Sequence, residues 1–232
     1  MTTEKEDAFR MINACCRSLA EAAAILDEDA RFLSARTGLG ETPLHYLAVE
    51  DKIEAVRWLA SRGAEIDPRN EFGQTPLMEA ASLGNTDLVF FLLEAGADPS
   101  VADDLGDTAM IAAATNGHLT IVQELLRRGV NVATTNNVEE TALYCAAQGG
   151  QASVVLALLE GGAEVGVTSM FGVTPLHIAA TYGHEAVARV LVEHGADVRA
   201  LTEEGQTAAD EARTAGHVEL ATYLDPKLGR NK

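Results

Sequence analysis

The six histidines are the residues of this 232-residue chain with the most versatile chemistry, because imidazole binds metal ions and transfers protons near neutral pH. His45 and His177 each end a Thr-Pro-Leu-His stretch, and three others directly follow a glycine: His118, His184 and His217. A metal site needs ligands that converge on one ion. These histidines recur at fixed places in successive repeats. We therefore expect them to hydrogen-bond turns and helix ends, and we expect no bound metal.

The three cysteines do not indicate a disulfide framework, because their number is odd and Cys15 and Cys16 are adjacent. Cys15 and Cys145 fall where small buried residues are expected. Cys16 is expected to face the concave side of the protein, which makes it the candidate for a reactive thiol. The start of the chain is polar, without a signal segment, and no run reaches about 18 apolar residues. These features predict a reducing, cytoplasmic setting.

Catalytic motifs are missing from the sequence. It contains no G-x-S-x-G, G-x-x-x-x-G-K-[ST], H-E-x-x-H or C-x-x-C stretch, and its carboxylates form no pair that must share a site. We therefore expect a protein that is not an enzyme and needs no cofactor.

The chain is strongly acidic, with a formal net charge of −18 and a pI of about 4.6. Such a charge repels nucleic acid and anionic membranes, so neither is an expected partner. It would attract a basic protein, although solubility alone also explains an acidic surface.

A threonine that recurs every 33 residues organises the chain, at Thr42, Thr75, Thr108, Thr141, Thr174 and Thr207. A fixed period of this length is typical of a repeat architecture. Glycine recurs two residues before the threonine and nine and 21 residues after it, with Glu139 and Asp51 as exceptions. Glycines at such places end helices or form turns with φ > 0. Each unit is therefore predicted to hold two helices and a tight turn.

An apolar stripe runs along the second predicted helix of each unit. Leucine stands 17 residues after every threonine, at Leu59, Leu92, Leu125, Leu158, Leu191 and Leu224, and valine or alanine stands three residues earlier. This spacing places both residues on one face of a helix. One unit alone cannot bury that face, so stacking must bury it, at roughly 25 cal/mol per Å² of apolar area.

The repeated unit G-x-T-P-L-H-x-A-A-x-x-G-H, followed by L-L-E-x-G-A-D, resembles the ankyrin repeat, most closely in residues 172–184 and 193–197. The resemblance covers nearly the whole chain. It implies an all-α solenoid of stacked antiparallel helix pairs, with β-hairpin-like loops on one side and a concave surface made by those loops and the first helices. We expect one domain over residues 1–232, with capping helices in 1–36, five internal repeats in 37–201, and a capping repeat with a tail in 202–232.

The loop tips just before each threonine are the predicted recognition elements. They hold nine acidic residues and no lysine or arginine. Three residues before the threonine runs an apolar column of Leu39, Phe72, Leu105, Val138 and Phe171. Loops on a rigid scaffold commonly carry binding sites. The column has two interpretations that the sequence leaves open, a contact surface for a partner or the packing of one loop against the next.

The predicted contact surface lies near the fifth unit, where Met170 precedes Phe171 and Tyr182 should face the same groove. The partner-binding residues are predicted to be Phe72, Leu83, Leu105, Val138, Gln148, Met170, Phe171 and Tyr182, with Asp103, Asp104, Glu139 and Glu140 steering the partner by their charge. The expected function is protein–protein recognition by a monomer. The alternative is an acidic holding protein that shields a basic, nucleic-acid-binding client, whose binding would depend steeply on salt.

Glu139 stands where the other units have glycine, and if this position keeps φ > 0, a residue with a Cβ there costs on the order of 1 kcal/mol. We expect the loop at residues 136–140 to open more readily than the neighbouring loops. Amide hydrogen exchange measures this opening; the alternative is that the loop simply adjusts to the substitution. Equal protection of the loops in units three to five would contradict the prediction.

Overall fold

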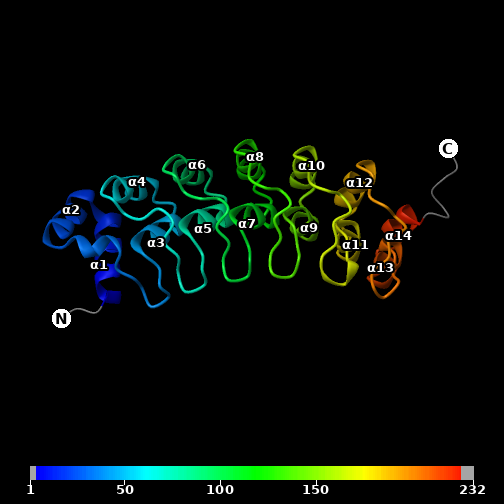
Figure 1. Cartoon of the computed structure of the whole chain (residues 1–232), viewed down its shortest axis with the longest axis horizontal. Helices are drawn as coiled ribbons and strands as arrows, with labels where there is room; N and C mark the ends of the chain where they lie inside the picture. The colour runs from blue at the N-terminus through cyan, green and yellow to red at the C-terminus, as the bar shows by residue number, and fades with distance from the viewer. Residues whose placement is uncertain (1–3, 226–232) are drawn as a thin grey trace. The chain divides into compact units, whose positions relative to one another are not determined.

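The computed structural model describes residues 4–225, which form 14 α-helices and two 3-10 helices (Figure 1). Within these residues the only β-type pairing consists of isolated antiparallel bridges, Ala102 with Thr108 and Thr135 with Thr141. The predicted all-α class is confirmed. The chain packs as two compact units, Met1–Ala109 and Met110–Lys232.

The first unit holds three helix pairs. Their bounds are α1 (Glu4–Arg17) with α2 (Leu19–Glu28), α3 (Pro43–Val49) with α4 (Ile53–Ser61), and α5 (Pro76–Leu83) with α6 (Thr86–Glu94), and the 3-10 helix η1 (Ala30–Leu33) follows α2. In Figure 1, α3 and α5 lie in one row and α4 and α6 in another, with the connecting loops projecting beyond the first row.

The second unit repeats this two-row arrangement. Its elements are α7 (Ala109–Thr115), which starts at the last residue of the first unit, α8 (Leu119–Arg127), α9 (Ala142–Gln148), α10 (Ala152–Glu160), η2 (Met170–Gly172), α11 (Pro175–Thr181), α12 (Glu185–Glu193), α13 (Ala208–Thr214) and α14 (Val218–Leu224). Here α11 packs between α9 and α13, and α10 packs between α8 and α12.

The threonine of the repeat begins the first helix of the pair. Thr174 has extended backbone angles, and its hydroxyl oxygen accepts a hydrogen bond from the backbone N–H of His177 at 3.3 Å. A proline at the first helical position has the φ that a helix requires and lacks the N–H that would go unpaired there. The three predicted turn positions all have positive φ, including Glu139 at 62° and Asp51 at 51°.

In the two repeats that have the motif histidine, His45 and His177, its ring bonds the loop of the following repeat. The ring Nδ1 of His177 accepts a hydrogen bond from the Thr174 N–H at 3.3 Å, and its Nε2 donates to the carbonyl oxygen of Gln206 at 3.2 Å. His45 does the same in the first unit, with Nε2 3.0 Å from the carbonyl oxygen of Gln74. The prediction that these histidines are structural is confirmed.

Burial lowers the pKa of His45 to about 4 and also lowers the pKa of His177. Both rings are therefore neutral near pH 7, with the proton on the Nε2 atom that faces a carbonyl. Two further histidines also bond backbone carbonyl oxygens, His184 to Gln148 at 2.9 Å and His194 to Val190 at 2.8 Å.

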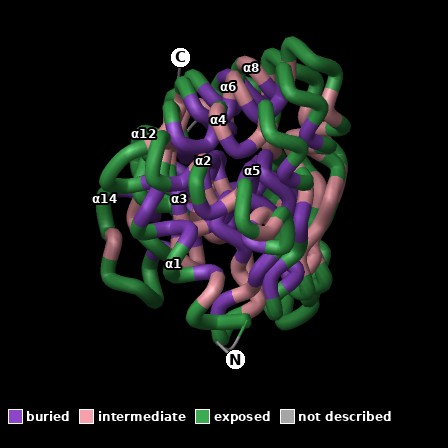
Figure 2. Tube along the Cα trace, turned by 90° about the vertical axis from the view of Figure 1, so that its left-hand side faces the viewer, coloured by how far each residue is buried: buried purple, intermediate pink, exposed green. Residues whose placement is uncertain are grey.

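The core consists of the stripes that the sequence predicts. All six leucines at 17 residues after the threonine have no exposed surface. In Figure 2 the buried parts of the trace lie inside and the exposed loops and helix ends lie outside. The 33-residue period therefore assigns the core residues of the second helices correctly.

In the first helix pair, the buried residue lies one position away from the one that the 33-residue period predicts. The period places Leu26 in the core, but Leu26 is half-buried and its neighbour Ile25 is buried. A single residue, Ser18, joins α1 to α2, whereas two residues separate α5 from α6. The shorter connection shifts the inward face of α2 by one position.

In the last helix pair, charged residues stand where the best-matching repeat has histidine and alanine. Asp210 takes the place of the motif histidine and accepts a hydrogen bond from the Thr207 N–H at 3.1 Å, and Arg213 lies 2.8 Å from Asp210. Such polar groups suit an outer face. The division into two caps and five repeats stays a prediction, and its last residues, 226–232, lie outside the described part of the chain.

We expect His45→Gln to reduce the acid sensitivity of folding. The pKa of His45 is about 4 in the folded protein against an ordinary 6.5. Its contribution to stability is therefore present above pH 6.5 and lost as the pH falls toward 4. The difference amounts to roughly 3 kcal/mol. Denaturant unfolding between these pH values measures it as the difference between wild type and variant, in which the other titrating groups cancel.

The matched control is His194→Gln, which removes an exposed histidine and should keep the wild-type pH dependence. If the wild type and His45→Gln lost stability in parallel as the pH fell, the assignment of His45 as a buried neutral ring would be wrong.

Candidate functional site

The loop tips are held by the side chain of their first residue. The Oδ1 atom of Asn70 accepts hydrogen bonds from the backbone N–H groups of Phe72 and Gln74, both at 3.0 Å. Asp103 and Asn136 make the same pair of bonds in their own tips, at 2.9 to 3.1 Å. These bonds fix the backbone of the tip, and the side chain of the third tip residue stays exposed.

Successive tips are joined by backbone hydrogen bonds at the apolar column. The carbonyl oxygen of the column residue accepts the N–H of a residue in the next tip, 2.9 to 3.5 Å away. The bonds run from Glu71 to Leu39 and from Asp104 to Phe72 in the first unit, and from Met170 to Val138 and from Glu203 to Phe171 in the second. The tips are thus aligned by main chain, and their alignment does not require the column side chains.

The column side chains are exposed. Their exposed fractions are 50% for Leu39, 54% for Phe72, 68% for Leu105, 46% for Val138 and 67% for Phe171. Packing of one loop against the next would cover these side chains. Their exposure favours the contact interpretation of the column.

In the first unit the predicted apolar contact residues are exposed, whereas the two predicted acidic residues make contacts within the protein. Phe72, Leu83 and Leu105 are exposed apolar side chains. Asp103 uses its carboxylate to hold its own tip, and Asp104 lies 3.5 Å from the guanidinium of Arg69. The two carboxylates are therefore partly compensated and are weaker steering charges than the sequence suggests.

In the second unit the predicted residues fall into two groups that are linked by contacts. Tyr182, at the end of α11, stacks on the ring of His184 with centroids 6.0 Å apart. The same ring bonds the carbonyl oxygen of Gln148, at the end of α9. Val138 and Met170 come from the two tips that a backbone hydrogen bond joins. Gln148 is half-buried, whereas the apolar members are exposed.

The tip at residues 169–173 has its own local structure. Ser169 stands where the other tips have Asn, Asp or Thr, and its hydroxyl donates to the carbonyl oxygen of Val173 at 3.3 Å. The 3-10 helix η2 follows, in which Phe171 has a φ of 67°. An aromatic residue at positive φ costs on the order of 1 kcal/mol, which the surrounding structure must offset. The sequence predicts the exposure of Phe171 and misses this conformation.

A cleft lies beside Phe171 in the second unit. It has a volume of about 490 Å³ and is lined by Phe171, Val173, Thr202, Glu203, Glu204 and Glu211. The sequence counts Glu203 and Glu204 among the acidic tip residues. It misses Glu211, which comes from α13, because nothing in the repeat pattern links that position to a tip.

Glu79 in α5 is half-buried, and its carboxyl contacts the Asn70 side chain of the tip. Its Oε1 accepts a hydrogen bond from the Asn70 side chain at 3.3 Å, while Oε2 is buried and meets no hydrogen-bonding group among the described residues. Burial, and then repulsion from Glu41, raises the pKa of Glu79 to about 8. The carboxyl is therefore mostly protonated at neutral pH.

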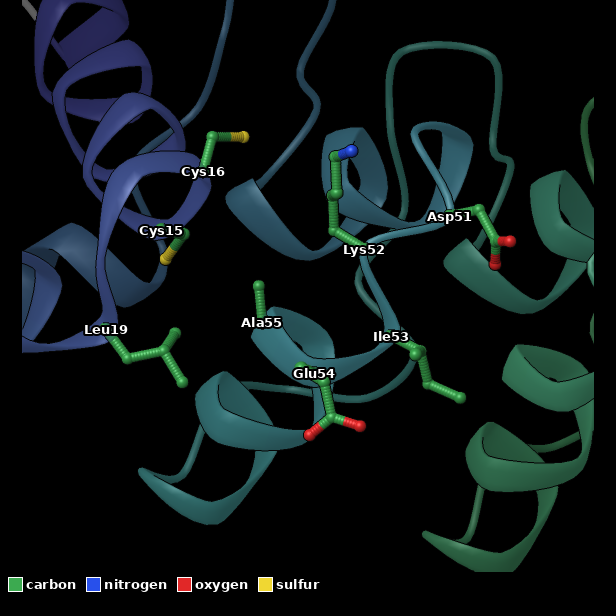
Figure 3. A pocket seen from close by; sticks show the side chains of 8 residues that line it. All are labelled: Cys15, Cys16, Leu19, Asp51, Lys52, Ile53, Glu54 and Ala55. Carbon is green, nitrogen blue, oxygen red and sulfur yellow. The ribbon is translucent and has the colours of Figure 1, made fainter.

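The cysteines divide as predicted into two buried thiols and one exposed thiol. Cys16 borders a pocket of about 300 Å³ between the end of α1 and the start of α4 (Figure 3). In Figure 3 the Cys16 side chain extends on the side of Lys52, whereas Cys15 points toward Leu19. Burial, and then the neighbouring Cys16, raises the pKa of the Cys15 thiol to about 12. Cys145 is buried beside Glu140, with Sγ 3.9 Å from its carboxylate.

Within residues 4–225, no three His, Cys, Asp or Glu side chains are grouped so that they could hold a metal ion. In the same part of the chain, no helix combines the length and the apolar character needed to cross a membrane.

The family model for ankyrin repeats (3 copies) matches residues 11–103, 77–169 and 158–231 of this chain. No curated protein matches the sequence.

We expect a maleimide reagent to modify Cys16 more than about tenfold faster than Cys15 or Cys145, because Cys16 is exposed to the reagent and the other two thiols are buried. Mass spectrometry of briefly treated protein identifies the modified residue. Cys16→Ser should abolish the fast phase, and Cys15→Ser should retain it. Fast modification of Cys15 would show that the end of α1 opens.

Proposed function

Because the chain belongs to the ankyrin-repeat family, whose members are generally protein–protein interaction modules, we propose that it binds another protein through the loop tips and first helices of its second unit. Catalysis has no part in this function. The predicted residues Val138, Gln148, Met170, Phe171 and Tyr182 supply the contacts.

The observation that carries the proposal is the exposure of large apolar side chains where the chain has no positive charge. Phe171, Tyr182, Met170 and Val138 are each more than 40% exposed. No lysine or arginine occurs between Arg128 and Arg189. Exposed apolar groups that gather in one region commonly mark interaction sites.

The scaffold reduces the entropic cost of binding. The tips are fixed by the side chains of their first residues and by the hydrogen bonds between tips, so few torsions remain to be ordered when a partner binds. Phe171 and Tyr182 are the anchors, because aromatic side chains contribute most to protein interfaces.

Charge steers the approach of the partner. Glu139 is exposed, whereas Glu140 accepts a hydrogen bond from the Asn136 side chain at 3.2 Å. Glu139 is therefore the freer of the two predicted steering residues, and a partner with basic groups at its rim fits best. Phe72, Leu83, Leu105, Asp103 and Asp104 belong to the proposal as a contact surface on the first unit.

The proposal places a monomeric protein in a reducing, cytoplasmic compartment, where its three free thiols would persist.

We expect the double variant Phe171→Ala, Tyr182→Ala to bind its partner at least about 30-fold more weakly, since two anchor residues contribute about 2 kcal/mol or more. Its unfolding free energy should change little, because both side chains are exposed. Pull-down from native extract with wild type and variant identifies the partner as the protein that only the wild type retains, and calorimetry then measures its affinity.

The matched control is Leu156→Ala, which removes an exposed apolar side chain from α10, in the other row of helices. It should bind as the wild type does. A double variant that lost stability and kept its affinity would support loop packing and contradict the proposal. Unchanged binding by the double variant, together with a steep loss of affinity in salt, would favour the holding alternative.

A further inference from the structure

The cleft beside Phe171 combines an aromatic wall with carboxylates. Phe171 is 67% exposed, and Val173, two residues later, is half-buried. Glu203 and Glu204 come from the following tip, and Glu211 comes from α13. The backbone hydrogen bond from Glu203 to Phe171, 2.9 Å long, holds the two walls together.

The carboxylates of this cleft have no cation of their own within residues 4–225. Arg213, two residues after Glu211, is engaged elsewhere, at 2.8 Å from Asp210 and 3.6 Å from Asp225. Glu203, Glu204 and Glu211 form no ion pair with any residue that the structure describes.

Elsewhere in this protein, arginine guanidinium groups bind where an aromatic ring and a carboxylate lie close together. In the second unit, the guanidinium of Arg189 lies 4.5 Å from the centre of the Tyr223 ring and donates from Nε to the carboxylate of Glu185 at 3.1 Å. In the first unit, Arg10 lies 5.2 Å from the Phe32 ring and 2.8 Å from Glu28. Each arginine is held between one aromatic face and one carboxylate.

We propose that the cleft lined by Phe171, Val173 and Glu211 receives an arginine side chain of the partner protein. The guanidinium is planar, so it can stack on the Phe171 ring while its N–H groups bond a carboxylate. Lysine has a compact ammonium that cannot do both as well. The apolar stem of the arginine lies against Val173.

The inference rests on the proposed function and narrows it to one chemical group. It also accounts for the strained backbone of Phe171. Phe171 stands at the cleft with a φ of 67°, whereas the third residue of every other tip lacks a positive φ.

The test uses the full chain and small probes observed by NMR. Titration with N-acetyl-arginine methylamide should give saturable shifts of the backbone amides of residues 171–173, 202–204 and 211. The neutral isostere N-acetyl-citrulline methylamide should give none, and the lysine analogue should bind more weakly. Shifts that spread evenly over the acidic tips of both units, or equal effects of arginine and citrulline, would overturn the proposal.

Matched charge variants separate the cleft from the general acidity of the chain. Glu211→Gln should weaken binding of the arginine probe roughly five- to tenfold, while Glu219→Gln, which removes an exposed carboxylate from α14, should leave it unchanged. Glu203→Gln with Glu204→Gln is the second variant, chosen because both side chains are exposed, and it should also weaken binding of the arginine probe. Equal affinities of Glu211→Gln and Glu219→Gln would contradict the proposal.

The two levels of the proposal fail differently. If the cleft variants leave partner binding intact while Phe171→Ala, Tyr182→Ala abolishes it, the protein-binding function stands and the arginine site is wrong. If neither set of variants changes the affinity for the partner, the second unit is not the contact surface.

Discussion

A helix pair of this chain carries an apolar stripe that it cannot bury by itself, and the arrangement of each unit follows from covering that stripe. The repeated leucine of α10 is fully buried because α8 and α12 pack on either side of its helix. Stacking at a fixed period then brings the loop tips into register, where main-chain hydrogen bonds join them. Because the helices supply the core and the main chain aligns the loops, the side chains at the tips are left available for binding.

The sequence predicts whatever depends on the period and misses what depends on a local departure from it. The leucine stripe, the positive φ of Glu139 and the role of His177 all follow from comparing units, and all are confirmed. The burial of Ile25 in place of Leu26 depends on the short connection between α1 and α2. The 33-residue period does not predict the length of this connection. Glu211 joins the cleft through the packing of α13, a relation between residues that lie far apart in the sequence.

Two neighbouring tips of the second unit hold residues with a Cβ in the left-handed region, Glu139 with φ of 62° and Phe171 with φ of 67°. They differ in how they depart from the repeat. Glu139 occupies a place where the other 33-residue repeats have glycine. Phe171 occupies a place where the residues of the other repeats lack a positive φ. The second departure is the more informative, since it re-aims an exposed aromatic ring and coincides with a cleft.

Glu79 has a consequence for the protons exchanged during folding. The formal charge of −18 counts this carboxyl as ionised, yet a pKa of about 8 leaves the folded protein one unit less negative near pH 7. Folding of the first unit therefore takes up a proton at neutral pH, and the buffer that supplies this proton contributes its own heat to a calorimetric measurement. Between about pH 4.5 and 6.5, His45 releases a proton on folding while Glu79 takes one up, so the two transfers offset each other within the same unit.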